Sequence, residues 1–286
     1  GYLGVDFFFI LSGFIIALSS ERLLERSEGI KAYASARMVR IYVPYLPVGI
    51  GVYLLYLLLP GLSATDRVPG ALTSFTLLPT ELPPALSVAW TLVHEMIFYA
   101  VFSLIFLSRA ALWTVLLIWA AAISFAWATK LQFTRFESYF LSPLNLYFLT
   151  GVSLFYVSKY WKASTPLSAG AFVAGGLAVV VGASFQEAFR LLAAAGFTLI
   201  VFGASSSWGT RMKIWRLPAV LGAASYAIYL VHNPALSIFV RLARWAHLDA
   251  LALPVIAAAA TLAGIAYWAI YERHALKFAR QLVKRL

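Results

Sequence analysis

The chain contains no cysteine and few charged residues, and both shortages limit what it can be. Without cysteine it can form no disulfide, thiol nucleophile or cysteine-ligated zinc site, and its redox compartment stays undetermined. Only 12% of the 286 residues are charged, whereas 62% are hydrophobic. Because a soluble globule of this composition would expose apolar side chains over most of its surface, the composition predicts an integral membrane protein.

Acidic residues are scarce as well, with 11 of them against 22 lysines and arginines, for a formal net charge of +11. Such an excess is compatible with nucleic-acid binding, but the basic residues lie in short breaks between long apolar runs, as in the cytoplasmic loops of membrane proteins. The charge therefore indicates topology and no nucleic-acid partner. Repeats, low-complexity tracts and linkers are absent, so we expect one all-α domain over residues 1–286, a polytopic transmembrane bundle.

Nine apolar runs are long enough to cross a hydrocarbon core of about 30 Å. They cover approximately residues 1–20, 41–60, 87–107, 111–128, 139–158, 166–183, 188–207, 217–240 and 251–271. Alternate connections, starting with residues 21–40, carry 16 of the lysines and arginines, and the others carry 6. The positive-inside rule therefore predicts that the first loop and the tail after Tyr271 are cytoplasmic and that Gly1 is outside. Because the first residue, Gly1, is not Met and is predicted outside, we expect a tenth helix to precede it. Residues 61–86 are predicted to form an outer loop with a short turn near residues 71–78.

Ionisable residues inside these runs are the first candidates for chemistry, because a charged side chain in a bilayer is costly. His94 and Glu95 lie in the run of residues 89–107, which carries no other charge. Asp6, Glu95 and His232 all fall in the outer half of the predicted bundle and can share a cavity. Two alternatives stay open: Glu95 and His232 only hydrogen-bond between helices and hold the bundle together, or Asp6 lies at headgroup depth.

A polar stripe is predicted on the eighth run, where Ser225, Tyr229 and His232 recur at offsets of four and three residues. A stripe of this kind normally faces the interior of a bundle. By contrast, we interpret Gly4, Gly13 and the three phenylalanines at residues 7–9 as helix-packing features.

Arg37 and Arg40 form a second constellation, in the connection predicted to be cytoplasmic. Three residues apart on a helix, they point the same way and can clamp a phosphate or diphosphate through bidentate hydrogen bonds. The alternative is that these arginines serve only topology or bind anionic lipid.

Four strings resemble the membrane acyltransferase 3 family in order and spacing: GVDFFFILSGF at 4–14, ARMVRIYVPY at 36–45, AWTLVHEMIFY at 89–99 and SYAIYLVH at 225–232. The resemblance spans nearly the whole chain. It implies a bacterial inner-membrane protein of ten helices that moves an acyl group, usually acetyl, from cytoplasmic acyl-CoA to a hydroxyl of a cell-envelope or exported carbohydrate. The implied acceptors include lipopolysaccharide O-antigen, peptidoglycan and exopolysaccharide. Acyl-CoA, normally acetyl-CoA, is then the donor substrate, with no permanently bound cofactor and no metal.

The resemblance also assigns roles to particular residues. Arg37 and Arg40 match the Arg-x-x-Arg pair that is thought to hold the CoA phosphates. Glu95 matches the acidic residue of the Trp-Ser/Thr-Leu-x-x-Glu-x-x-Phe-Tyr motif, whereas His94 occupies a position that is commonly apolar and receives no role. The Ser-Tyr-x-x-Tyr-Leu-x-His stretch of the family is matched by Ser225, Tyr226, Tyr229 and His232.

The chain departs from the family at both ends. Family members carry an Arg and a His, ten intervening residues apart, on a first helix, and that His is the favoured catalytic base. This sequence starts just after the position where that helix should end. The Arg and His motif is therefore expected on the same helix that is missing here. After the last helix the family tends to have a Glu followed closely by Pro, whereas this chain reads Tyr-Glu-Arg-His from Tyr271 to His274.

Acyl transfer to a sugar hydroxyl needs a base, a charged group that orients the base and a donor to the developing oxyanion, and it requires no metal. Our hypothesis is that the base is the His of the preceding helix, that Glu95 or Asp6 orients it, and that Tyr229 or His232 assists at the acceptor. A proton-coupled transporter is the rival interpretation, because intramembrane acidic and His residues also form proton relays, although no internal symmetry supports it. A catalytically inactive, truncated relative is the third.

Overall fold

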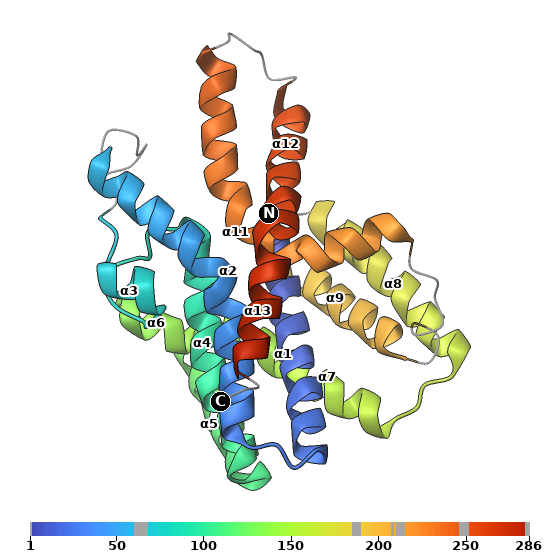
Figure 1. Ribbon diagram of the computed structural model, residues 1–286. Coiled ribbons are helices and arrows are strands. Elements are labelled where there is room, and N and C mark those ends of the chain that lie inside the picture. The colour runs from blue at the N-terminus through green and yellow to red at the C-terminus, as the bar shows by residue number, and fades with distance from the viewer. Residues whose placement is uncertain are drawn as a thin grey trace. The chain divides into compact units, whose positions relative to one another are not determined.

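The computed structural model describes residues 2–59, 68–184, 190–206, 209, 215–245 and 252–283. Every regular element in these ranges is helical, which confirms the predicted all-α fold (Figure 1). In chain order the elements are α1 (Tyr2–Glu25), α2 (Ile30–Leu58), α3 (Ala71–Thr76), the 3-10 turn η2 (Ser87–Ala89), α4 (Trp90–Phe102), the 3-10 turn η3 (Ser103–Phe106), α5 (Arg109–Ala128), α6 (Arg135–Leu141), α7 (Leu144–Tyr160), α8 (Thr165–Ser184), α9 (Arg190–Ser205), α11 (Arg216–Trp245), α12 (Ala252–Tyr267), the π-helical turn η5 (Trp268–Glu272) and α13 (Arg273–Val283).

Eight helical segments of the described chain are long and apolar enough to cross a membrane, so the protein is a multi-pass membrane protein. They are Leu3–Glu25, Ile30–Leu58, Ser87–Phe106, Arg109–Ala128, Arg135–Tyr160, Thr165–Ser184, Arg216–Trp245 and Leu253–Val283. The remaining predicted span corresponds to α9, whose 16 residues extend over only about 24 Å.

Some helices extend beyond the limits expected from hydropathy. The second span begins at Ile30 rather than near residue 41, and the last continues to Val283 rather than ending near Tyr271. Hydropathy locates the apolar part of a helix, but the hydrogen-bonded backbone continues through polar residues that favour the helical conformation. The expected short turn near residues 71–78 is the helix α3.

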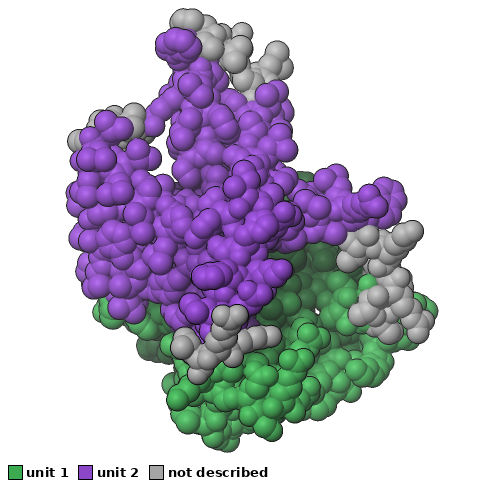
Figure 2. Space-filling view, in the orientation of Figure 1, with its two compact units in different colours: residues 1–33, 97–213 green, residues 34–96, 214–286 purple. Residues whose placement is uncertain are grey.

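The chain divides into two compact units (Figure 2). Unit 1 comprises residues 1–33 and 97–213, and unit 2 comprises residues 34–96 and 214–286. Two of the three boundaries therefore fall inside α2 and α4, and the third, between residues 213 and 214, lies outside the described residues. Among the predicted site residues Asp6 belongs to unit 1 and all others belong to unit 2. That residues 1–286 form a single domain stays a prediction.

In unit 1, α1 and α7 approach so closely that only glycine fits at two positions. A Cβ atom on Gly13 would lie 2.1 Å from the carbonyl oxygen of Phe148, and one on Gly151 would lie 2.0 Å from the carbonyl oxygen of Ile10. Small residues at such crossings let the two backbones make van der Waals contact, which drives helix association in lipid. The packing role predicted for Gly13 is thus confirmed, whereas a Cβ on Gly4 would meet no atom within 4 Å.

The phenylalanines at residues 7–9 also serve packing. Phe9 is fully buried, and its ring centroid lies 4.6 Å from that of Phe148 on α7. Phe98 stacks on the same Phe148 ring at 4.3 Å. Phe7 contacts Phe197 of α9 with a centroid distance of 5.1 Å. Phe7 and Phe9 thus pack against α9 and α7 within unit 1, which confirms the packing role predicted for this run.

In unit 2, α11 and α12 pack side by side, and a Cβ atom on Gly264 of α12 would lie 2.5 Å from the Cα of Ile228. Figure 1 shows that α11 is bent along its length. Pro234 lies inside this helix and cannot donate a hydrogen bond to the carbonyl of Leu230, which accounts for the bend.

The α1–α7 crossing predicts a marked difference between two glycines on one helix. Gly13→Ala should destabilise the protein by about 1–3 kcal/mol, because the added methyl group forces the two backbones apart. Gly4→Ala, on the same helix but facing open space, should change stability by less than about 0.5 kcal/mol. Unfolding of the purified variants in detergent measures both values, and equal stabilities would contradict the packing described here.

Candidate active site

The helix that carries the predicted arginine pair is interrupted by Pro44 and Pro47. Each proline lacks an N–H group, so backbone carbonyls one turn earlier lose their usual donors. Here the carbonyls of Arg40 and Val43 lose their donors, and the Tyr271 hydroxyl donates to that of Val43 (3.3 Å). Two further tyrosine hydroxyls donate to neighbouring carbonyls of the same stretch, Tyr226 to that of Ile41 (3.2 Å) and Tyr267 to that of Pro44 (2.7 Å). Prolines are tolerated in membrane helices when neighbouring groups satisfy the backbone in this way. The arrangement ties α2 to α11, α12 and η5.

Arg40 lies on this same stretch of α2. Its Nη1 atom is 3.6 Å from Oε1 of Glu272, and its guanidinium carbon is 5.2 Å from the centre of the Tyr226 ring. Arg37 is half-buried one turn earlier. Both arginines are on one continuous helix, as their spacing predicted. Glu272 received no role from the sequence, although the family tends to have a Glu after its last helix, because the pairing of residues so far apart in the chain leaves no local pattern.

The first turn of α4 joins two of the sequence motifs. The hydroxyl oxygen of Thr91 is 2.5 Å from that of Tyr229 on α11, and the Tyr229 hydroxyl also donates to the carbonyl of Val88 at 2.8 Å. Glu95 lies one turn after Thr91, is only 6% exposed, and is near enough to Tyr229 to act on it electrostatically. The motif around Glu95 and the motif around Tyr229 therefore meet in one place.

His94, the neighbour of Glu95, is 4% exposed. Its ring packs edge-to-face against the Trp90 indole with a centroid distance of 5.7 Å. This contact gives His94 a packing role in the first two turns of α4.

His232 is half-buried on α11, and its ring is oriented by the backbone. Its Nδ1 atom lies 2.7 Å from the carbonyl oxygen of Tyr229 and 3.1 Å from that of Ile228. A carbonyl oxygen only accepts, so Nδ1 must carry the proton in these contacts. In the neutral ring the lone pair is then on Nε2, which is the nitrogen able to accept a proton.

The predicted inward polar stripe on α11 was wrong at one position. Ser225 is exposed, and its hydroxyl donates to the carbonyl of Gly222 in its own helix at 2.8 Å. Tyr226 is buried in its place, against α2. Both residues lie within one turn of Tyr229, so periodicity alone could not choose between them.

Asp6 is fully buried in unit 1, so it does not lie exposed at the end of its helix. Its carboxylate accepts two hydrogen bonds from Arg190 of α9, from Nε at 2.8 Å and from Nη2 at 2.7 Å. The pair is bidentate, which is the strongest geometry available to an arginine and a carboxylate. That Asp6 shares a cavity with Glu95 and His232 stays a prediction.

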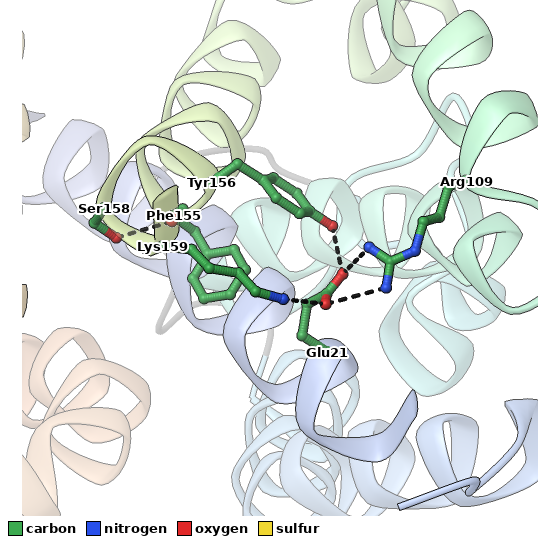
Figure 3. A network of polar contacts seen from close by, with 6 residues as sticks. All are labelled: Glu21, Arg109, Phe155, Tyr156, Ser158 and Lys159. Atoms are coloured by element: carbon green, nitrogen blue, oxygen red, sulfur yellow. Dashed lines mark hydrogen bonds and ion pairs between the residues drawn. The ribbon is translucent and has the colours of Figure 1, made fainter. Parts of the chain in front are cut away.

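A second buried carboxylate in unit 1 was missed by the sequence analysis, which placed Glu21 in the first loop. Glu21 lies within α1 and is 3% exposed. Figure 3 shows its carboxylate surrounded by side chains from α5 and α7. It accepts hydrogen bonds from Arg109 (2.5 and 3.2 Å), Tyr156 (2.9 Å) and Lys159 (2.7 Å). The connections predicted around Glu21, Arg109 and Lys159 were all expected on one side of the membrane, and the structure brings these three side chains together.

The chain was compared with known proteins. The family model for the acyltransferase domain of the acyltransferase 3 type matches residues 1–272. The exopolysaccharide production protein ExoZ of Rhizobium meliloti (strain 1021) is 32% identical over 305 aligned residues, which cover 98% of this chain and 91% of that protein. No solved structure matches the chain.

The Glu21 network predicts that one carboxylate holds three helices together. Glu21→Gln should lower the free energy of unfolding by about 2 kcal/mol, because charge-assisted hydrogen bonds are lost and two cations are left without their counter-ion. Denaturant titration in detergent checks this, with exposed Glu25→Gln on the same helix as the control. A Glu21 variant as stable as the Glu25 variant would show that the network contributes nothing.

Proposed function

The chain belongs to the acyltransferase 3 family and is a membrane acyltransferase, and from this we propose that it transfers an acyl group, normally acetyl, from acyl-CoA to a hydroxyl of a carbohydrate. The similarity to an exopolysaccharide production protein supports an exported polysaccharide as the acceptor, within a class that also includes lipopolysaccharide and peptidoglycan. Family membership favours the enzyme over the proton-coupled transporter.

Contacts between the family-like motifs in unit 2 support a role for particular residues. In unit 2 the Thr91 hydroxyl meets the Tyr229 hydroxyl at 2.5 Å, beside the buried Glu95. In the same unit Arg40 lies over the ring of Tyr226. Three of the four motifs that resemble the family are thus joined by direct contacts, although they are far apart in the sequence.

The reaction in this proposal is an acyl substitution. The sugar hydroxyl oxygen attacks the thioester carbonyl carbon, a base accepts the hydroxyl proton, and the carbon–sulfur bond then breaks. The leaving CoA thiolate takes up a proton, so the products are an ester and CoA. Stabilisation of the tetrahedral oxyanion by a preorganised donor lowers the barrier further.

We assign the groups to these tasks as follows. Glu95 orients the general base and stabilises the positive charge that the base acquires. Nε2 of His232 and the phenol of Tyr229 assist at the acceptor hydroxyl and the oxyanion. Asp6, whose two oxygens both accept hydrogen bonds from Arg190, takes part as a fixed charge and transfers no proton.

The donor is proposed to bind at the arginine pair. Arg37 and Arg40 each offer a planar set of N–H donors that matches phosphate oxygens, and acyl-CoA carries a diphosphate and a 3′-phosphate. The pair would anchor the nucleotide end of the donor and leave the thioester to reach the residues around Glu95.

Loss of the Glu95 charge should abolish the reaction. Membranes containing the protein, incubated with labelled acetyl-CoA, should transfer label into envelope or exported polysaccharide. Glu95→Gln should reduce transfer at least about 100-fold, because proton transfer contributes a factor of that size and the base depends on the Glu95 charge for its orientation. The amount of inserted protein should be unchanged, because glutamine keeps the shape of the side chain.

The control for this experiment is Glu28→Gln, which removes an equal charge from an exposed position and should leave transfer at the wild-type rate. Unchanged acetylation in Glu95→Gln would remove Glu95 from the mechanism. Absence of transfer by the wild-type protein would contradict the proposed function itself.

We further propose that the protein lies in the bacterial inner membrane with Gly1 outside and the C-terminus in the cytoplasm, because the connections rich in lysine and arginine define the inner face. A green fluorescent protein fused after Leu286 should fluoresce, and alkaline phosphatase at the same position should be inactive. Active phosphatase at this site would reverse the proposed orientation.

A further inference from the structure

Glu272 is the least satisfied buried carboxylate in the described part of the chain. It is 1% exposed, and its Oε2 atom has no hydrogen-bond partner among the described residues. Its Oε1 atom is 3.6 Å from Nη1 of Arg40, and the carboxylate also accepts a hydrogen bond from the backbone N–H of Ala227 and feels the charge of Arg280 on α13. Burying a carboxylate is costly unless hydrogen bonds compensate, so an arrangement of this kind calls for an explanation other than stability.

Arg40 is held in a complementary way. Its side chain is 42% exposed, and a charge contact and the face of the Tyr226 ring fix the guanidinium from two directions. Neither contact uses a hydrogen bond, and the described residues accept none from this guanidinium. Arg40 is therefore oriented while its N–H donors stay available. Arg190 and Arg109 differ, because carboxylates accept hydrogen bonds from both.

The position of Glu272 depends on the π-helical turn η5. One additional residue in a turn rotates the residues that follow by about 100° relative to a continuous α-helix. With this turn Tyr271 reaches the carbonyl of Val43 while Glu272 reaches Arg40, so both contact the interrupted stretch of α2. Single π-turns within α-helices occur frequently at functional sites.

We propose that Glu272 is a positioning residue for the acyl donor: it holds the Arg40 guanidinium against the Tyr226 ring with its N–H donors free for a phosphate group of acyl-CoA. The inference rests on the proposed function and goes beyond it, since it adds a third residue, from the far end of the chain, to the donor site. A carboxylate at ionic distance orients the arginine, whereas a bidentate pair would occupy the N–H groups that a phosphate needs.

The test measures CoA binding to the detergent-purified full chain by calorimetry. Glu272→Gln removes the charge that orients the Arg40 guanidinium. With the guanidinium in the binding orientation for about a tenth of the time, the Kd for CoA should rise about tenfold. In an Arg40→Ala background the same substitution should cause no further loss, because the residue acts only through Arg40. Glu272→Asp, which keeps the charge, should weaken binding less than Glu272→Gln and supplies the same comparison if the glutamine variant does not fold.

Controls separate this effect from general damage. Glu28→Gln changes the net charge equally at an exposed site and should leave the Kd for CoA unchanged. An unchanged or lower Kd in folded Glu272→Gln, or an equal loss in the Arg40→Ala background, would overturn the positioning role while the proposed function stands. If the wild-type chain does not bind CoA, both the role and the donor assignment fail.

Discussion

A carboxylate buried among apolar helices needs a cation or hydrogen-bond donors close by, and ion pairs that meet this need lie in both units of the protein. Asp6 is bound by Arg190 in a bidentate pair, and Glu21 accepts hydrogen bonds from two cations and a phenol. Both are satisfied and stabilise helix packing. Glu272 meets the same requirement through Arg40, but it accepts no hydrogen bond from that arginine. The difference separates a structural ion pair from one whose arginine stays available to a ligand.

The second constraint is the backbone of α2. Two prolines interrupt its hydrogen bonding at the level of the arginine pair, and a membrane offers no water to replace the lost donors. The Tyr271 hydroxyl replaces the donor that Pro47 removes from the carbonyl of Val43, and the hydroxyls of Tyr226 and Tyr267 donate to neighbouring carbonyls of the same stretch. Because Tyr226 also presents its ring to Arg40, one side chain both contacts the backbone of this stretch and orients the guanidinium. A feature that would weaken an isolated helix thus fixes the elements around the candidate donor site.

Much of the candidate site was predictable, because its residues occur in local strings. Glu95, Tyr229 and His232 were identified from polar residues within apolar runs and from motif spacing, and the structure joins the first two motifs through Thr91. Glu21 escaped because a charge near the end of an apolar run resembles a loop residue. Ser225 was wrongly placed inward, since neighbouring positions on a helix differ too little in periodicity to be distinguished.

The sequence by itself determined that this chain is a helical membrane protein of the acyltransferase 3 type, where its helices lie, and which few ionisable residues they contain. These properties follow from local composition, because apolar runs of sufficient length form helices in a bilayer whatever surrounds them. Only the tertiary structure decided which charges pair, such as Arg40 with Glu272, and which neighbour on a helix turns inward. Charge pairing depends on contacts between segments far apart in the chain. Neighbouring positions on a helix are nearly equivalent by local pattern, so packing against other helices determines which side chain is buried.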